Sequence, residues 1–288
     1  MTAEPETVNG RILAAWLLLR QAEARAVIIA NPRPYFLVAK TGKGTVTDPE
    51  VTDGVTIVRF DNPPVNALDL DLLEVITASM RKVEGPVVIT GAGRCFSAGV
   101  DLRALADGGA EYAGRFVTAL SEAFLAVFDH PAPVVAAING HAIAGGCVLA
   151  MCADVRLMSG GTIGLTELSV GVPFPVAALE ICRFVMGTSV TRAALQAKTI
   201  DADPALAQGW VDAVVPNDEL ISQATATARE LGQYSPAAYA ATKRQLHQPA
   251  RAAIEAGAEM DATVRASWVN EETRGRIAAF VEALARKR

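Results

Sequence analysis

The sequence predicts an α/β fold with a buried parallel sheet, followed by an all-helical C-terminal region. From Val55 onward, short apolar runs alternate with segments of helical periodicity. Strands too apolar to face water are typical of parallel sheets whose two faces are covered by helices. The last quarter of the 288 residues is helical in pattern, with cap residues before proline at Asp203-Pro204 and Ser235-Pro236. Because 51% of the residues are hydrophobic and 20% are charged, the chain is expected to fold around a sizeable core.

The first predicted strand, VTIVRF at 55–60, precedes a helix whose apolar positions recur every three or four residues. These positions are Leu68, Leu72, Leu73, Ile76 and Met80. Gly85 is expected just after the end of this helix, at its C′ position. The wholly apolar run PVVIT at 86–90 then predicts a second strand.

The middle of the chain repeats this order of strand, loop and helix. A glycine-containing loop is expected through Gly99, and Gly145-Gly146 is expected to open a helix. The other predicted elements are strands at 133–138, 154–158 and 162–164, and helices at 110–128 and 176–186. The C-terminal helices are predicted at 218–232, 236–247, 250–266 and 270–286. Their alanine-rich faces indicate contact with another subunit.

Three regions follow from this pattern: an N-terminal extension at 1–47, a core at 48–216, and a helical oligomerisation region at 217–288. The apolar run at 12–19 is too short to span a bilayer, so an amphipathic surface helix is expected there. The apolar stretch 134–153 is interrupted by Asn-Gly and Gly-Gly, which a membrane helix would hardly carry.

The net charge and the pattern of cysteines and histidines exclude several kinds of binding partner and site. The 26 basic and 31 acidic residues give a net charge of −5, which offers no basic field for nucleic acid or anionic lipid. The cysteines at 95, 147, 152 and 182 show neither CxxC spacing nor a dense framework, so reduced thiols and a cytoplasmic location are expected. The three histidines form no metal-ligand pattern.

Chemistry is expected at two loops of small residues, 94–102 and 138–147, because dinucleotide, P-loop and hydrolase-elbow motifs are absent. Small residues let the backbone approach a ligand closely, and two convergent N–H groups can form an oxyanion hole. Taken alone, each loop is more simply explained as a tight turn beside a packed helix.

Together with their neighbours, these loops resemble the crotonase, or enoyl-CoA hydratase/isomerase, superfamily. Six segments carry the resemblance in order: NPPVNALD (62–69), FSAGVDL (96–102), PVVAAINGHAIAGGC (133–147), CADVRLM (152–158), TIGLTELSVGV (162–172) and AQGWVDAVVP (207–216). The resemblance implies a spiral of ββα units with an all-helical C-terminal region, assembled as homotrimers or dimers of trimers. It also implies an acyl-CoA substrate, with no permanently bound cofactor and coenzyme A present as part of the thioester.

The resemblance further assigns roles to single residues. The backbone N–H groups of Val100 and Gly145 are implied to bind the thioester oxygen, and the backbone around Ala67, Leu68 and Ala98 is implied to hold the adenine end of coenzyme A. Substrate contacts are also expected at Gly146, Val148, Pro173 and Phe174.

Acid–base groups then distinguish the reactions of the superfamily. Its hydratases use two glutamates, and the first position is occupied here by Val148, which cannot transfer a proton. The second position is Glu167, and a carboxyl group in an apolar pocket has a raised pKa that suits proton transfer near neutrality. A single glutamate favours the 1,3-proton shift that converts 3-enoyl-CoA to 2-enoyl-CoA. Without the resemblance, Glu167 would be interpreted as a capping or surface residue.

Two alternatives stay open. The first is an enoyl-CoA hydratase, or another CoA-thioester enzyme, whose second acid comes from elsewhere, with Glu180 as a weak candidate. The second is a catalytically silent CoA-binding subunit, because fold alone does not establish activity. Structural roles are expected for a packed or hydrogen-bonded His141, for Asp101 and Asp154 bonding to backbone, and for Cys147 and Cys152 as inert buried thiols.

Overall fold

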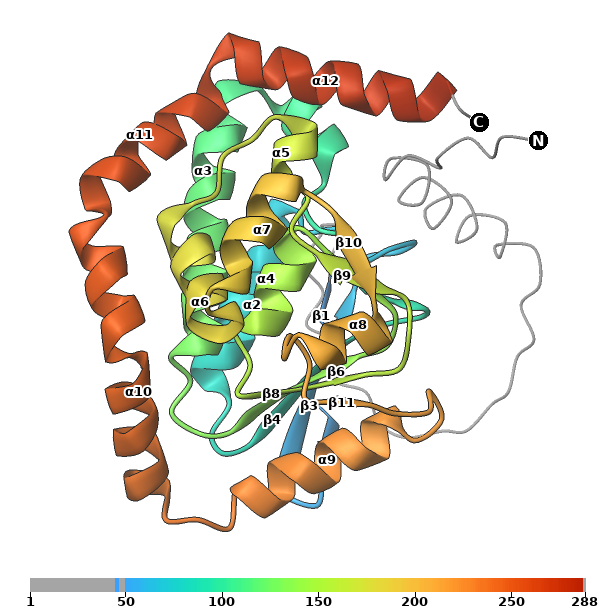
Figure 1. Cartoon of the computed structure of the whole chain (residues 1–288), viewed down its shortest axis with the longest axis vertical. Helices are drawn as coiled ribbons and strands as arrows, with labels where there is room; N and C mark the ends of the chain where they lie inside the picture. Colours follow the sequence, from blue (N-terminus) through green and yellow to red (C-terminus); the bar gives the residue numbers. More distant parts are fainter. Residues whose placement is uncertain (1–44, 47–49, 287–288) are drawn as a thin grey trace.

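The computed structural model describes residues 45–46 and 50–286. The expected surface helix at 12–19 and nearly all of the expected 1–47 extension lie outside the described residues. The described part consists of two sheets, helices packed against them, and three C-terminal helices that run along one side and across the top in Figure 1.

The larger sheet confirms the predicted buried parallel architecture. Strands β3, β4, β6, β8 and β11 run parallel in that order, while β1 and β2 pair antiparallel with β3. Every residue of β4 and β6 is buried, as expected for central strands. The bounds are β1 (Thr45–Val46), β2 (Glu50–Thr52), β3 (Val55–Asp61), β4 (Val87–Gly91), β6 (Val134–Ile138), β8 (Val155–Met158) and β11 (Ala213–Val214).

A second sheet of short strands explains the spiral. Its strands are β5 (Cys95–Ser97), β7 (His141–Ile143), β9 (Thr162–Gly164) and β10 (Thr199–Asp201). Strands β5, β7 and β9 are parallel, and each follows a strand of the larger sheet and precedes a helix. Three successive ββα units therefore stack with their equivalent strands side by side, which confirms the expected spiral.

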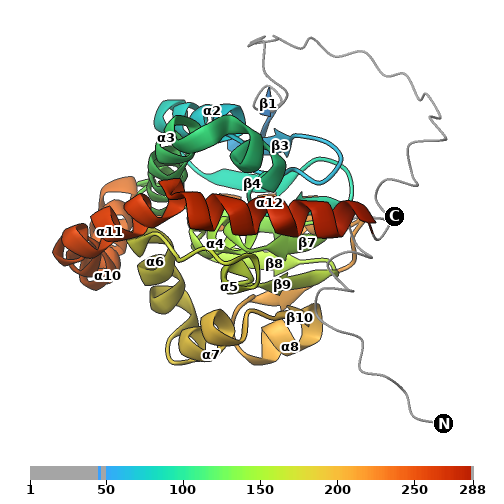
Figure 2. The same cartoon turned by 90° about the horizontal axis from the view of Figure 1, so that it is seen from above.

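The helices cover both faces of the larger sheet (Figures 1 and 2). Asp69 begins α2 by accepting the Leu72 N–H at 2.8 Å, and α2 turns Leu72 and Leu73 into the main core. Helix α9 packs on the opposite face through buried residues such as Ala224 and Ala228. The bounds are α2 (Leu70–Lys82), α3 (Leu102–Phe128), α4 (Gly145–Met151), α5 (Glu167–Val170), α6 (Val176–Met186), α7 (Ser189–Gln196), α8 (Ala202–Ala207), α9 (Leu220–Leu231), α10 (Pro236–Ala256), α11 (Ala258–Val269) and α12 (Glu271–Arg286).

Several predicted boundaries inside the core are corrected by the structure. The helix expected at 110–128 begins at Leu102, because Asp101 accepts the N–H groups of Arg103 and Ala104 at 3.0 and 2.9 Å. A kink at Gly109 explains why the regular pattern becomes visible only beyond it. Gly85 has a positive φ of 83° but lies two residues beyond the C-cap of α2, not at C′.

The four predicted C-terminal helices are present among the described residues, but one boundary between them lies elsewhere. The break expected between 247 and 250 is absent, because α10 continues through Pro249 and ends before Gly257. An ideal Cβ on Gly257 would lie 2.7 Å from a methyl of Val176, so the junction of α10 and α11 packs closely on α6. Ser235 caps α10 as predicted, whereas the helix near Pro204 is capped at Asp201 and not at Asp203.

A buried ion pair attaches α10 to the sheet. Lys243 Nζ lies 2.8 Å from Asp154 Oδ2, and the same oxygen accepts the Val134 N–H at 2.8 Å. Asp154 thus bonds backbone as expected, and it also fixes a C-terminal helix.

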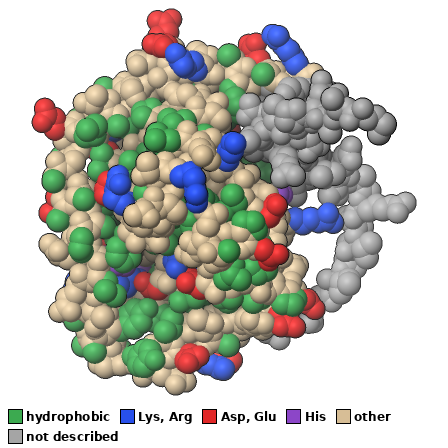
Figure 3. Space-filling view, in the orientation of Figure 1, with side chains coloured by type: hydrophobic (Ala, Val, Ile, Leu, Met, Phe, Trp, Pro, Cys, Tyr) green, Lys and Arg blue, Asp and Glu red, His purple; other side chains and the backbone are tan. Residues whose placement is uncertain are grey.

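On the side drawn in Figure 3, lysine and arginine are dispersed among acidic, apolar and other side chains. Among residues 45–46 and 50–286, no helix is both long and apolar enough to cross a membrane.

Candidate active site

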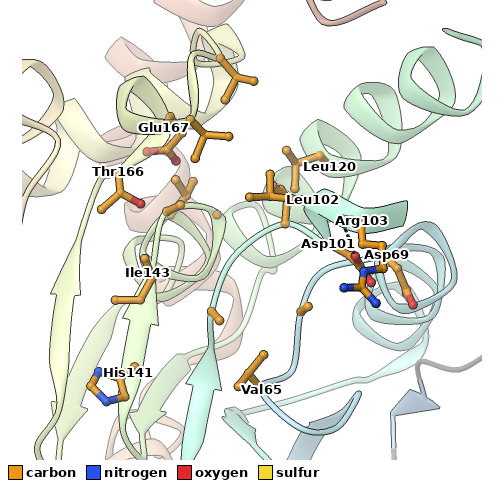
Figure 4. Close-up of a pocket in the computed structure, with 18 of the residues that line it drawn as sticks. Val65, Asp69, Asp101, Leu102, Arg103, Leu120, His141, Ile143, Thr166 and Glu167 are labelled. Carbon is orange, nitrogen blue, oxygen red and sulfur yellow. Dashed lines mark hydrogen bonds between the residues drawn. The ribbon is translucent and has the colours of Figure 1, made fainter. Parts of the chain in front are cut away.

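A cavity of about 360 Å³ lies beside the ends of β5 and β7, bounded by the first turns of α3, α4 and α5. Most of its wall is apolar, and polar side chains are found at both ends, with Glu167 on one side and Asp69, Asp101 and Arg103 on the other (Figure 4). Six of the ten residues expected at the site line it: Ala67, Ala98, Val100, Gly145, Val148 and Glu167.

The first loop directs the N–H of Val100 away from the neighbouring chain segment. Leu68 donates its N–H to Gly99 O at 2.8 Å and accepts the Asp101 N–H at 2.9 Å, which forms an isolated parallel bridge between Leu68 and Val100. In such a bridge the flanking residues make the bonds, so the N–H of Val100 points to the opposite side. Val100 lines the cavity, and no acceptor for its N–H occurs among the described residues.

The second loop presents the N–H of Gly145 in the same way. Gly145 is the first residue of α4, and N–H groups of a first helical turn have no intrahelical acceptor. Ala144 before it has φ 50° and ψ −121°, a strained conformation for alanine that costs about 1–3 kcal/mol. Two hydrogen bonds stabilise this conformation. Ala144 N–H donates to Gly164 O at 2.8 Å, and Val148 N–H donates to Ala144 O at 3.0 Å.

The two loops are in contact, which brings Val100 and Gly145 together. An ideal Cβ on Gly145 would lie 3.6 Å from Val100 Cγ1. Gly99 has φ 85°, and a Cβ there would lie 2.7 Å from Ile143 O and 3.4 Å from Gly145 N. Only glycine therefore fits at 99, and its lack of a side chain lets the Val100 amide approach the Gly145 amide. The arrangement can offer two N–H donors to one oxygen atom.

Glu167 faces this cavity from the start of α5. The residue is 7% exposed, and its Oε2 has no hydrogen-bond partner among the described residues. Burial raises the pKa of its carboxyl group to about 8, and the N–H groups of Thr166 and Glu167 offset this rise only in part. A buried carboxyl group that titrates near neutrality can both accept and return a proton at physiological pH.

Among the described residues, no second carboxyl group lies beside Glu167 at its end of the cavity. Val148 lines the wall with an apolar side chain that is 1% exposed. Glu180 does not line the cavity, and its two oxygens accept from Arg183 Nε at 3.3 and 3.1 Å. Asp69 and Asp101 do line the cavity, but each caps a helix, and Figure 4 shows both on the side away from Glu167.

The other four expected residues lie behind the wall. Leu68 is fully buried with its backbone N–H and C=O engaged in the bridge, and a Cβ on Gly146 would lie 2.4 Å from Ser97 O, so Gly146 lets α4 pack on β5. Pro173 and Phe174 are absent from the wall, to which Val172 and Pro175 contribute instead. The segment after Glu167 therefore lines the cavity as expected, but through Val172 and Pro175 and not through Pro173 and Phe174.

His141 also lines the cavity but is hydrogen-bonded to Thr162, and Cys147 and Cys152 are buried. The His141 Nδ1 lies 3.1 Å from the Thr162 N and 3.0 Å from Thr162 Oγ1, and burial lowers the pKa of the imidazole. Burial also raises the pKa values of the Cys147 and Cys152 thiols well above their usual range, which makes them unreactive. The described residues contain no group of histidine, cysteine or carboxylate side chains suited to a metal ion.

Sequence reasoning did not identify the residues that close the cavity opposite the loops. These are Leu120 and Phe124 of α3, Trp268 of α11, and Phe280 and Val281 of α12. Each is an ordinary apolar residue of a helix, and no local signal indicates which helix face lines the cavity. Trp268, Phe280 and Val281 also lie more than a hundred residues after Glu167 in the sequence.

Comparison with known proteins decides the family. The family model described as enoyl-CoA hydratase/isomerase matches residues 50–287. The chain belongs to the enoyl-CoA hydratase/isomerase family. It is 34% identical to the mouse protein named enoyl-CoA delta isomerase 1, mitochondrial, over 192 residues that cover 63% of this chain and 66% of that protein.

Other relatives of the family carry hydratase names. The chain is 30% identical to the 2,3-dehydroadipyl-CoA hydratase of Escherichia coli over 195 residues, which cover 67% of this chain and 76% of that protein. The crystal structure of the enoyl-CoA hydratase EchA3 from Mycobacterium ulcerans superposes with a TM-score of 0.70 at 32% identity, covering 77% of this chain and 99% of that one. Because both reactions occur among these names, the choice between them rests on the residues of the site.

Proposed function

We propose that this protein is an enoyl-CoA isomerase that moves the double bond of a 3-enoyl-CoA into conjugation with the thioester, giving 2-enoyl-CoA. The observation that carries the proposal is one buried carboxyl group, Glu167, in a cavity where Val148 occupies the position of the first hydratase glutamate. A 1,3-proton shift needs one group that takes and returns a proton, whereas addition of water calls for a second group to orient the water.

The proposed reaction has two proton transfers. The Glu167 carboxylate removes a proton from C2, the carbon next to the thioester carbonyl, and the electron pair moves onto the carbonyl oxygen to give an enolate. The N–H groups of Val100 and Gly145 stabilise that oxygen, and one such donor typically contributes a hundredfold or more in rate. Glu167 then returns the proton to C4, the double bond forms between C2 and C3, and no water is consumed.

Coenzyme A is proposed to enter past the first loop. Ala67 and Ala98 line the cavity there, and their methyl groups leave room for the backbone to approach a ligand. Leu68 is not retained in this role, because its N–H and C=O are both bonded within the fold. Coenzyme A is thus part of the substrate, and no resident cofactor is needed for the proton shift.

The decisive experiment offers purified protein a 3-enoyl-CoA and a 2-enoyl-CoA of several chain lengths. Conversion of the first substrate is expected, and Glu167→Gln is expected to lower its kcat/KM by about 10²–10⁴-fold. Glu180→Gln is the matched control, because that carboxylate lies outside the cavity and is held by Arg183. Its activity should equal that of the parent.

Two results would replace the proposal. Addition of water to 2-enoyl-CoA faster than isomerisation would favour a hydratase with an unassigned second acid. Binding of CoA thioesters without turnover would favour a silent binding subunit. Val148→Glu extends the test, because introducing the missing carboxyl group is expected to add hydration to the isomerase and not to replace it.

We also propose an oligomeric state and a cellular location for this protein. A homotrimer or dimer of trimers is supported by Leu168, Leu195 and Leu206, which are 44%, 71% and 41% exposed on α5, α7 and α8. Light scattering on the purified protein tests this, and a monomer at micromolar concentration would contradict it. A cytoplasmic location is supported by the four cysteines, all of which are free and buried.

A further inference from the structure

Trp268 is the largest side chain that the C-terminal helices contribute to the cavity. It lies on α11, lines the same cavity as Glu167, and is only 1% exposed. Its Nε1–H donates to Pro173 O at 2.9 Å, which ties α11 to the segment that follows Glu167. The indole is therefore held in one position at the cavity wall.

The space behind Trp268 is filled by aromatic rings of α3. Phe116 stacks on Trp268 with ring centroids 6.3 Å apart and an interplanar angle of 30°, and Tyr112 stacks on Phe116 at 6.2 Å. Phe116 is fully buried and does not line the cavity. Close-packed rings therefore lie beyond the indole, and a ligand cannot extend past it in that direction without displacing Trp268.

The surroundings of Trp268 suit a hydrocarbon chain. Leu120 and Phe124 of α3 and Val172 before α6 line the same cavity. Figure 4 shows Glu167 on the side of the cavity away from Asp69 and Asp101. Phe280 and Val281 of α12 close another part of the wall but are only half-buried. The wall at α12 is consequently one helix thick, whereas the wall at Trp268 is backed by the core.

We infer that Trp268 ends the acyl subsite and sets the longest acyl chain that the enzyme accepts. The inference rests on the proposed acyl-CoA function, to which it adds a residue that determines chain length. It assigns a role in catalysis to the C-terminal helices that is separate from proton transfer and from binding of the thioester oxygen.

The test measures binding of saturated, straight-chain acyl-CoAs of increasing length by calorimetry. Saturated thioesters have no double bond to move, so binding reports the subsite independently of the chemistry. Each methylene that is buried should tighten binding about fourfold, until the chain meets Trp268 and the gain stops. In Trp268→Leu this stop should move to longer chains, and in Trp268→Phe by a smaller amount, while affinity for the shortest chains stays within twofold of the parent.

Trp210 provides a matched control. It is also a buried, hydrogen-bonded tryptophan, 3% exposed with its Nε1–H bonded to Ser189 Oγ at 2.9 Å, but it does not line the cavity. Trp210→Leu and Trp210→Phe are expected to leave the stopping length unchanged. An unchanged stopping length in folded Trp268 variants, or an equal shift in the Trp210 variants, would overturn the inference.

If the Trp268 variants fail to fold, a fluorescence measurement tests whether Trp268 contacts the end of the acyl chain. The chain has three tryptophans, so the double variant Trp16→Phe/Trp210→Phe retains Trp268 as its only indole. Acyl-CoAs near the stopping length should change its emission, and coenzyme A alone should not. An emission insensitive to bound long-chain acyl-CoA contradicts the inference, whereas failure of every CoA thioester to bind contradicts the proposed function itself.

Discussion

Replacing Glu167 by glutamine is expected to stabilise the fold at neutral pH while removing activity. The carboxyl group is buried, its Oε2 has no partner among the described residues, and burial raises its pKa from the usual 4.5 to about 8. In the unfolded chain the same group ionises freely in water. Ionisation at neutral pH therefore favours the unfolded state, and glutamine, which does not ionise, removes that effect.

The size of the effect follows from proton linkage. Because the folded-state pKa lies above the unfolded value, the stabilising contribution of the proton is fully present below about pH 4.5 and is lost as the pH rises towards 8. Each pH unit in this window costs about 1.4 kcal/mol, so between pH 4 and pH 7 the parent protein loses roughly 3 kcal/mol that the variant keeps.

Urea unfolding at pH 4 and pH 7 measures this difference. The free energy of unfolding of Glu167→Gln, relative to the parent, should be larger at pH 7 by roughly 3 kcal/mol, which moves the urea midpoint by about 1 M or more. If Glu167→Gln differs from the parent by the same amount at both pH values, the carboxyl group is hydrated and the mechanism built on its burial is refuted.

Three further predictions concern the base, the first loop and the ion pair. The kcat/KM for isomerisation should rise with pH, with its midpoint near the pKa of Glu167 of about 8, so that pH 7 gives about a tenth of the plateau; a flat profile from pH 6 to 9 would contradict this. Gly99→Ala, whose Cβ would lie 2.7 Å from a backbone oxygen at φ 85°, should lower kcat about a hundredfold in steady-state assays. Gly275→Ala is its control, since a Cβ there meets no described atom within 4 Å, and should preserve activity. Lys243→Met, which leaves Asp154 buried without its cation, should reduce the free energy of unfolding by about 3–5 kcal/mol in urea titrations, and a loss below 1 kcal/mol would argue against burial of the pair.

The parallel sheet could be predicted because its strands are long enough to show their character. Strands such as β4 and β6 consist of five consecutive buried residues, a composition that few other elements share. The second sheet was harder to foresee, because β5 and β7 have three residues each and were expected within loops or a longer apolar run. Three residues carry no measurable periodicity, so tertiary pairing alone defines them.

Local signals also failed where packing overrides them. Pro249 ordinarily interrupts a helix at a cost of about 3 kcal/mol, yet α10 continues through it. Nearby, His247 stacks on Phe128 with ring centroids 3.7 Å apart, and Lys243 pairs with Asp154. Such long-range contacts hold the helix against the core and are invisible in the sequence around the proline.

Some residues of the site could likewise be predicted from local sequence motifs, and others could not. Val100, Gly145, Val148 and Glu167 lie in compact motifs whose resemblance to a family could be recognised from the chain alone, and the structure brings all four to one cavity. Trp268 belongs to no motif. Its position depends on how α11 folds back over α3, which a helical pattern does not specify.

The cavity wall formed by α11 and α12 is the last part of the site to be synthesised. A ribosome adds Phe280 more than a hundred residues after Glu167, so a nascent chain that has reached α9 already contains the base and both amide donors but no α11 or α12. At that stage the cavity lacks the part of its wall that Trp268 and Phe280 form. The emerging chain therefore has its proton-transfer group before it has a complete acyl-binding cavity, which is closed only by the last helices to be made.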